Sequence, residues 1–238
     1  MIPDGGWFER PVVDIARDML GGYFTHRTPE GAVTIRIVEV EAYDGEIDPG
    51  SHAFRGLTQR NRTMFGPPGH LYVYRHLGLH TCANIVCGPK GRAAAVLLRA
   101  GEVLNVSRET NPSVVRAEYA RTPVETTENS LPLARARRNA TGITRSDIDL
   151  AQGPARLTVA LGISITDDGA SILDPNGPFT LRLATQNTEH IMSGPRVGVS
   201  GEGGRADLFP WRFWLADDPH VSTYRPAQLR KRKSSRNL

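Results

Sequence analysis

The chain contains little cysteine, and it has no long hydrophobic run. Its two cysteines, Cys82 and Cys87, are five positions apart. An odd spacing places them on opposite faces of a strand, so we expect no disulfide. No run of about 18 apolar residues occurs, which argues against a membrane-spanning helix. The first 20 residues lack the apolar core of a secretion signal, so the sequence predicts a cytoplasmic protein.

The sequence lacks the residues typical of amine nucleophiles, metal sites, nucleotide-binding loops and serine hydrolases. The only lysines, Lys90, Lys231 and Lys233, lie outside apolar runs, so a buried amine nucleophile is poorly supplied. The His and Cys residues form neither a helical HxxxH motif nor a CxxC pair. No GxxxxGK[ST], no GxGxxG between a strand and a helix, and no GxSxG occurs. We therefore predict no metal and no cofactor.

Acidic residues are missing from one long segment. Residues 49–101 contain none, whereas the ten residues before them, 39–48, contain five. Such a block of one sign is typical of a surface that faces phosphates. A solvated face in a chain with 26 arginines is the alternative, since charge informs about partners and not about chemistry. The basic residues of the segment are Arg55, Arg60, Arg62, Arg75, Lys90, Arg92 and Arg99.

Apolar patterning predicts a mixed α+β domain over residues 1–224. Helical spacing of Val13, Ala16, Arg17 and Leu20 indicates an opening helix over 10–20. A second helix is expected after Gly153, with Leu157, Ala160 and Leu161 on one face. Residues 105–149 predict a loop with weak helices, and the basic tail 225–238 is expected to be disordered. The short apolar runs at 32–43, 70–77, 81–88, 93–104, 179–184 and 208–215 predict a mainly antiparallel sheet.

Strict alternation places carboxylates where apolar residues are expected. Within residues 33–43, Glu39 and Glu41 continue the face of Val33, Ile35 and Ile37. A buried carboxylate needs a partner or a cavity. An ordinary buried ion pair, or an edge glutamate that reaches solvent, would also satisfy the pattern.

Two further strands carry unusual faces. Arg99 shares a strand face with apolar residues, so Glu41 and Arg99 are natural partners. Tyr72 and Tyr74 share a face with two histidines in the run 70–77. Such tyrosines serve either as core packing or as flat walls on which bases stack, and strand spacing alone does not decide between them.

The whole series of motifs is more specific than its parts. Residues 36–86, "RIVEVEAYDGEIDPGSHAFRGLTQRNRTMFGPPGHLYVYRHLGLHTCANIV", resemble the 3-methyladenine (alkyladenine) DNA glycosylase family, in its bacterial form. The resemblance continues through "VLLRAGEVL", "LAQGPARLTVALGI", "GPRVGV" and "PWRFWL". It implies a curved antiparallel sheet surrounded by helices. It also implies a monomer that acts on damaged purines in double-stranded DNA, near the nucleoid, without a cofactor.

The resemblance also implies a role for individual residues. Glu41 would activate the attacking water, and Arg99 with the backbone carbonyl of Val197 would hold that water. Tyr43 and His52 would line the base pocket. The remaining implied residues are Tyr74, which would close an aromatic sandwich, and Asn84, which would disfavour the exocyclic amine of guanine.

The implied DNA contacts lie between the two groups of pocket residues. Met64 would lie near the opposite strand, and Arg60 and Arg62 would contact the DNA. Members of the family commonly place a wedging tyrosine three residues beyond "YVY", where this chain has Leu77. Leucine is also a known wedge, so base flipping is expected to remain, with altered stacking in the gap.

The expected reaction is hydrolysis of the N-glycosidic bond with no lyase step, giving an abasic site. The expected substrates are 3-methyladenine, 7-methylguanine, hypoxanthine and ethenoadenine. A non-catalytic binder of damaged DNA is the main alternative. A nucleoside or glycoside hydrolase is disfavoured because Glu39 and Glu41, about 7 Å apart on one strand, would not flank one bond. Glu39 is expected to form a structural ion pair.

Overall fold

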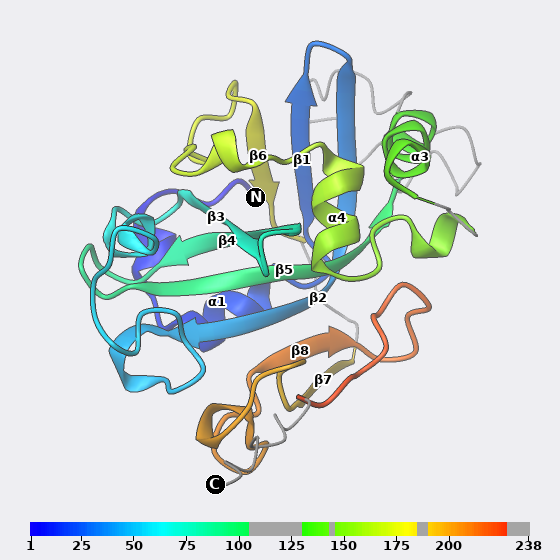
Figure 1. Ribbon diagram of the computed structural model, residues 1–238. Helices are drawn as coiled ribbons and strands as arrows, with labels where there is room; N and C mark the ends of the chain where they lie inside the picture. The colour runs from blue at the N-terminus through cyan, green and yellow to red at the C-terminus, as the bar shows by residue number, and fades with distance from the viewer. Residues whose placement is uncertain (105–129, 143–145, 185–189, 228–238) are drawn as a thin grey trace, which may run out of the picture.

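The computed structural model describes residues 1–104, 130–142, 146–184 and 190–227, and it is an α+β fold (Figure 1). Its strands are β1 (Tyr23–Thr28), β2 (Gly31–Asp44), β3 (Leu71–His76), β4 (His80–Cys87), β5 (Ala94–Val103), β6 (Phe179–Arg182), β7 (Ile191–Gly194) and β8 (Arg212–Leu215). Its α-helices are α1 (Val12–Met19), α3 (Ser130–Thr141) and α4 (Pro154–Leu161). Short 3-10 turns are η1 (Gly6–Glu9), η2 (Gly45–Ile47), η3 (Arg62–Phe65), η5 (Asp147–Asp149), η6 (Ile165–Asp167) and η7 (Glu202–Gly204). No helix in the described ranges is long and apolar enough to cross a membrane.

One eight-stranded sheet organises the fold. The main path runs β3-β4-β5-β2-β1-β6, and β8 pairs with both β2 and β7. Every described pairing is antiparallel, as the sequence predicts. The segment Glu39–Glu41 of β2 therefore lies between β5 on one side and β8 on the other.

A register irregularity marks the centre of β2. Ile37 pairs with Gly101, Glu39 with Ala100 and Val40 with Leu98, so the register shifts on both sides of Glu39. Arg99 falls in the second shift, between two paired positions. Bulges of this kind re-aim side chains, and this one places Arg99 against the carboxylates of β2.

The helices pack around the central strands. In Figure 1, α1 lies behind β2 and β5, and α4 lies in front of the sheet. The predicted face of α4 is confirmed, because Leu157, Ala160 and Leu161 are buried, with Pro154 in the first turn. These residues and the buried face of α1 join one large hydrophobic core.

The predicted face of α1 is only half right, because Ala16 and Leu20 are buried, whereas Val13 is partly exposed and Arg17 is exposed. The helix buries Val12, Ile15, Ala16 and Met19, not the face through Val13 and Arg17. A guanidinium is costly to bury without a partner. The spacing i, i+3, i+4, i+7 from Val12 is wholly apolar, so the helix turns Arg17 outward.

The apolar patterning of the sequence did not predict two of the strands, β1 and β7. Strand β1 carries polar residues such as Thr25 and His26, yet both are buried. His26 stays within hydrogen-bonding distance of the Leu161 carbonyl, at 2.9 Å. Strand β7 lies just before the glycine-rich connection and is held by β8 alone. In both strands, pairing with distant partners overrides weak local preference.

The cysteines lie as their spacing predicts. Cys82 and Cys87 are free and buried, and they point to different sides of β4. Cys87 packs in the main core, and Cys82 lines a pocket on the other face. Of the predicted loop region 105–149, the described part contains α3 and η5, and residues 105–129 and 143–145 lie outside the described residues, as does most of the predicted tail.

Candidate active site

One pocket gathers most of the residues implied by the sequence. It has a volume of about 660 Å³, which suits a flat heterocycle. Its walls come from alternate residues of β2 to β5, and from the segments around residues 153–156, 197–200 and 222–225. Eight of the eleven predicted site residues line it: Glu41, Tyr43, His52, Met64, Tyr74, Asn84, Arg99 and Val197.

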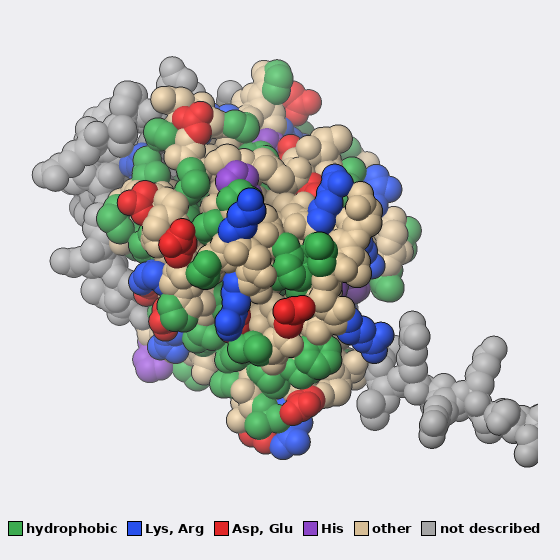
Figure 2. Space-filling model, turned by 90° about the vertical axis from the view of Figure 1, so that its left-hand side faces the viewer, with side chains coloured by type: hydrophobic (Ala, Val, Ile, Leu, Met, Phe, Trp, Pro, Cys, Tyr) green, Lys and Arg blue, Asp and Glu red, His purple; other side chains and the backbone are tan. Residues whose placement is uncertain are grey.

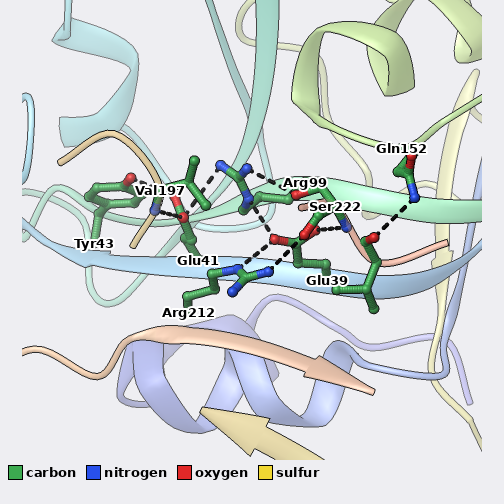
Figure 3. Close-up of polar contacts among 9 residues, drawn as sticks. Glu39, Glu41, Tyr43, Arg99, Gln152, Val197, Arg212 and Ser222 are labelled. Atoms are coloured by element: carbon green, nitrogen blue, oxygen red, sulfur yellow. Dashed lines mark hydrogen bonds and ion pairs between the residues drawn. The ribbon is translucent and has the colours of Figure 1, made fainter. Parts of the chain in front are cut away.

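Glu41 is fully buried on the pocket face of β2, while its neighbours Val40 and Ala42 pack in the core. Its Oε1 accepts a hydrogen bond from the Val197 N–H at 2.7 Å, and its Oε2 accepts one from the Tyr43 hydroxyl at 2.8 Å (Figure 3). The predicted role of the Val197 carbonyl stays a prediction. The observed role of this residue is to hold the carboxylate through its N–H.

Arg99 joins the two carboxylates of β2. Its Nε donates to Glu39 Oε1 at 2.9 Å, and its Nη1 lies 3.3 Å from Glu41 Oε1. Burial alone would lower the pKa of Arg99, but Glu41 and then Glu39 raise it. The guanidinium is therefore a permanent cation beside Glu41, and the predicted Glu41–Arg99 partnership is confirmed.

Glu39 has a full set of partners away from the cavity. Its Oε1 also accepts from Arg212 Nε at 2.7 Å, and its Oε2 accepts from the Ser222 N–H at 2.8 Å (Figure 3). Burial raises the pKa of Glu39, but the charges of Arg99 and Arg212 hold it below its usual value. The predicted structural ion pair is confirmed, with two cations in place of one.

Tyr43 is a fixed hydrogen-bond donor. Burial, and then the charge of Glu41, raises the pKa of Tyr43 well above its usual value. Its hydroxyl therefore stays protonated and donates a hydrogen bond to Glu41. The ring lies over the guanidinium of Arg196, with 4.5 Å between the guanidinium carbon and the ring centroid.

An aromatic wall stands opposite the carboxylate. Tyr72 and Tyr74 stack with their ring centroids 5.5 Å apart, and His52 meets Tyr74 edge-on at 4.6 Å. Burial, then Arg60 and His76, lowers the pKa of His52. His52 is therefore a neutral hydrogen-bonding group at neutral pH. The Nδ1 atom of His52 lies 3.2 Å from the hydroxyl oxygen of Tyr72.

Two other pocket residues are held in place by their surroundings. The Nδ2 of Asn84 donates to the Tyr72 carbonyl at 3.0 Å, which leaves the Oδ1 of Asn84 as the free end of the amide. Met64 is only 3 % exposed and packs with the tyrosines of β3. Its side chain lines the pocket, and little of its surface is available to the opposite DNA strand in this structure.

The tip of the β3–β4 hairpin projects its leucines. Leu77 and Leu79 are 78 % and 80 % exposed. The Leu79 N–H donates to the His76 carbonyl, closing a tight turn in which Leu77 and Gly78 both have positive φ, 50° and 73°. A left-handed leucine costs about 1–2 kcal/mol. Such strain, combined with full exposure, is typical of functional positions.

Two of the seven cations in the acid-free segment form ion pairs. Arg99 and Arg92 pair with acids, Arg92 with Asp44 at 3.0 Å. Five cations are exposed and form no salt bridge with described residues. Figure 2 shows Lys and Arg side chains separated by hydrophobic and acidic ones on the face that it displays. These five are Arg55, Arg60, Arg62, Arg75 and Lys90.

Among the five exposed cations of residues 49–101, Arg60 is the one that contacts an aromatic residue of the pocket. Its guanidinium carbon lies 5.7 Å from the centroid of Tyr74, and its Nη2 donates to the Arg75 carbonyl at 3.2 Å. Arg62 is exposed at the start of η3. Neither residue lines the cavity, so any phosphate contacts that they make lie outside it.

Four important residues were missed in the sequence: Asp48, Arg196, Arg212 and Ser222. Signals for three existed. Asp48 closes the acidic run, and Arg196 precedes Val197 in "GPRVGV". Arg212 alternates with apolar residues in "PWRFWL", much as Arg99 does on β5. Nothing in the local sequence marks Ser222, which meets Glu39 across 183 positions.

Comparison with known proteins identifies a family. The family model for "Methylpurine-DNA glycosylase (MPG)" matches residues 6–219. A relative from Streptomyces avermitilis is 46 % identical over 230 residues, covering 96 % of this chain and 94 % of its own. One from Leifsonia xyli is 47 % identical over 215 residues, covering 90 % and 88 %. One from Mycobacterium tuberculosis is 41 % identical over 218 residues, covering 90 % and 89 %.

All three relatives carry the name "Putative 3-methyladenine DNA glycosylase". The matched region begins at η1, ends after β8, and so contains every residue of the pocket except the last few, at 222–225. The chain belongs to the methylpurine-DNA glycosylase family.

Proposed function

We propose that this DNA glycosylase extrudes a damaged purine from duplex DNA into the pocket and hydrolyses its N-glycosidic bond with a water activated by Glu41. The observation that carries the proposal is a buried carboxylate with fixed donors, beside a permanent cation, in an aromatic pocket of suitable size. All of these groups come from one chain, which supports action as a monomer.

The contacts of Glu41 favour one oxygen as the base. Oε1 is engaged by Val197 and lies near Arg99, whereas Oε2 accepts only the Tyr43 hydroxyl among the described residues. A carboxylate oxygen has two lone pairs, so Oε2 retains one toward the cavity. Proton transfer from water to Oε2, together with the negative charge near the sugar, would lower the barrier to an oxocarbenium-like transition state.

The substrates proposed are 3-methyladenine, 7-methylguanine, hypoxanthine and ethenoadenine. 3-Methyladenine and 7-methylguanine carry positive charge as nucleotides and leave readily, so their release needs little assistance from the pocket. Hypoxanthine is neutral and needs help as a leaving group. His52 is held neutral at neutral pH, so it would help such a base by hydrogen bonding rather than as a standing cation.

Simple hydrolysis is proposed, with no lyase step. Lys90 is exposed in the turn between β4 and β5 and does not line the pocket. A Schiff base with the sugar needs an amine at the reacting carbon. A borohydride-trapped adduct between the protein and abasic DNA would contradict this part of the proposal.

The function is tested by base release under single-turnover conditions. Duplexes that each contain one of the four proposed lesions are incubated with excess protein, and abasic sites are counted after alkaline cleavage. Release of at least one modified purine, with undamaged duplex left intact, is expected. Tight binding of the lesion duplexes without release would instead support the non-catalytic binder, which has no need of a buried Glu41.

Leu77 is proposed as the wedge that fills the gap left by the extruded nucleotide. Extrusion of a base costs a few kcal/mol, and a side chain that fills the gap offsets part of this cost. Because alanine fills the gap less well, we expect Leu77→Ala to slow single-turnover excision about 10-fold. Leu79→Ala removes an equally exposed leucine from the same turn and serves as the comparison. Equal rates for Leu77→Ala and the unmodified protein would rule out the wedge role.

A further inference from the structure

A fully buried ion pair lies behind the catalytic carboxylate. The side chains of Asp48 and Arg196 are both 0 % exposed. The two Nη atoms of Arg196 donate to the two carboxylate oxygens of Asp48, at 2.5 and 2.6 Å. Asp48 also accepts from the N–H groups of Gly50 at 2.8 Å and Asp44 at 3.3 Å. Every oxygen of Asp48 is thus engaged twice.

The same guanidinium holds backbone from two parts of the chain. Its Nη1 donates to the carbonyl of Ala42 at 2.9 Å, and its Nη2 donates to the carbonyl of Gly203 at 2.7 Å. Ala42 is the residue between Glu41 and Tyr43 on β2. Arg196 therefore ties the strand that carries Glu41 to the loop after β7.

Both hydrogen-bond donors of Glu41 depend on Arg196. Val197, which donates its N–H to Oε1, is the next residue in the chain. Tyr43, which donates its hydroxyl to Oε2, has its ring stacked on the guanidinium. A movement of Arg196 would therefore displace the two groups that fix the orientation of Glu41.

Two further aromatic rings pack around Arg196. The rings of Phe209 and Trp211 lie 5.6 and 5.5 Å from its guanidinium carbon. Replacing a buried ion pair with apolar side chains is often neutral or stabilising. Apolar side chains would not bind the two carbonyls of Ala42 and Gly203 while stacking under Tyr43, so stability alone does not account for this pair.

We propose that the Asp48–Arg196 pair is a positioning device that holds Tyr43 and Val197 against the carboxylate of Glu41. The proposal rests on the proposed glycosylase function, since it concerns the orientation of its general base. Neither Asp48 nor Arg196 lines the pocket, so they act only through the two donors. The pair should therefore affect the chemical step and leave lesion binding unchanged.

Two variants disturb the pair in different ways. Asp48→Asn removes the charge that holds the guanidinium. Gly50→Ala keeps both charges, but an added Cβ would lie 2.4 Å from Arg196 Nη2 and 2.9 Å from Val199 Cγ1, so the guanidinium or its neighbour must shift. Because misplaced catalytic groups cost on the order of 100-fold, we expect each variant to slow single-turnover release of hypoxanthine about 10- to 100-fold. The Kd for a duplex with a 2′-fluoro lesion nucleotide, which resists cleavage, should change less than about 3-fold.

The coupling to Tyr43 separates positioning from general stability. Tyr43→Phe keeps the ring and removes the hydroxyl, so it deletes one of the two contacts that the pair maintains. In the Tyr43→Phe background, Asp48→Asn should cost distinctly less than it does alone, because residues that act through one contact are not additive. Rate losses that simply multiply would overturn the proposal.

Asp44→Asn is the matched control. Asp44 ends the same strand, and its carboxylate pairs with the exposed Arg92 rather than with Arg196, so its rate should equal that of the unmodified protein. All rates are measured at least 10 °C below each melting temperature. Unchanged rates in both folded variants, or the failure of both to fold, would assign the pair to stability alone. If the unmodified protein releases no base, the proposed function fails first.

Discussion

Glu41→Gln should lower the single-turnover rate of base release by about 100- to 10,000-fold, the range that a positioned general base contributes. Gln preserves the volume of the side chain and can still accept from the Val197 N–H. It loses the negative charge beside Arg99 and cannot take a proton from water. The large effect follows from removing the base and the charge together, at a site with no bulk solvent to replace either.

The expected signature is a loss of rate with binding preserved. Affinity for a duplex with a 2′-fluoro lesion nucleotide should stay within about 3-fold, because the aromatic wall and the hairpin tip are untouched. Glu30→Gln, in the turn before β2 with 69 % of its side chain exposed, is the matched control and should be fully active. A Glu41→Gln protein that excises at even a tenth of the normal rate would contradict the assignment of the base.

Glu39→Gln should have the largest effect on stability. Removing one partner from a buried ion pair costs about 3–5 kcal/mol, and Glu39 is shared by two buried cations, Arg99 and Arg212. Urea denaturation at pH 7 measures the loss. Asp18→Asn, which breaks the exposed pair with Arg10, should cost less than about 1 kcal/mol. Equal losses in the two variants would contradict the structural role of Glu39.

The effect of Glu39 should depend on pH in a definite direction. Burial raises the pKa of Glu39, but the charges of Arg99 and Arg212 lower it by more. The folded-state pKa therefore lies below the ordinary value of 4.5. Its contribution is therefore fully present above about pH 4.5 and is lost as pH falls through the lower folded-state value. The stability difference between the unmodified protein and Glu39→Gln should shrink in that acidic range. If this stability difference grows as the pH falls, the pKa of Glu39 is not lowered in the folded state and the prediction is wrong.

Local patterning predicted the parts of the site that lie on strands. Alternation alone placed Glu41 and Arg99 on faces where each needed the other, and the structure brings them within 3.3 Å. The aromatic face of β3 could not be assigned by spacing, because tyrosines pack in cores as readily as they line pockets. The pocket shows that both occur: Tyr72 is buried, and Tyr74 faces the cavity.

Contacts between distant segments could not be predicted. Arg196 and Asp48 are separated by 148 positions, and Arg212 and Glu39 by 173. Each residue read alone is an ordinary charged residue, and only the pairing of β8 with β2 brings the second pair together. The face of α1 failed for a different reason, since two apolar phases were available and only the energetic cost of burying Arg17 separates them.

The late position of the β7–β8 segment has a consequence for biosynthesis. The groups that hold Glu39 and Glu41 from outside the first hundred residues all lie between 196 and 222. During translation, β2 and β5 leave the ribosome before these groups, when only Arg99 and Tyr43 are available to the two carboxylates. A nascent chain that has not yet reached residue 222 therefore carries the strands of the proposed site without all of the groups that hold its two carboxylates.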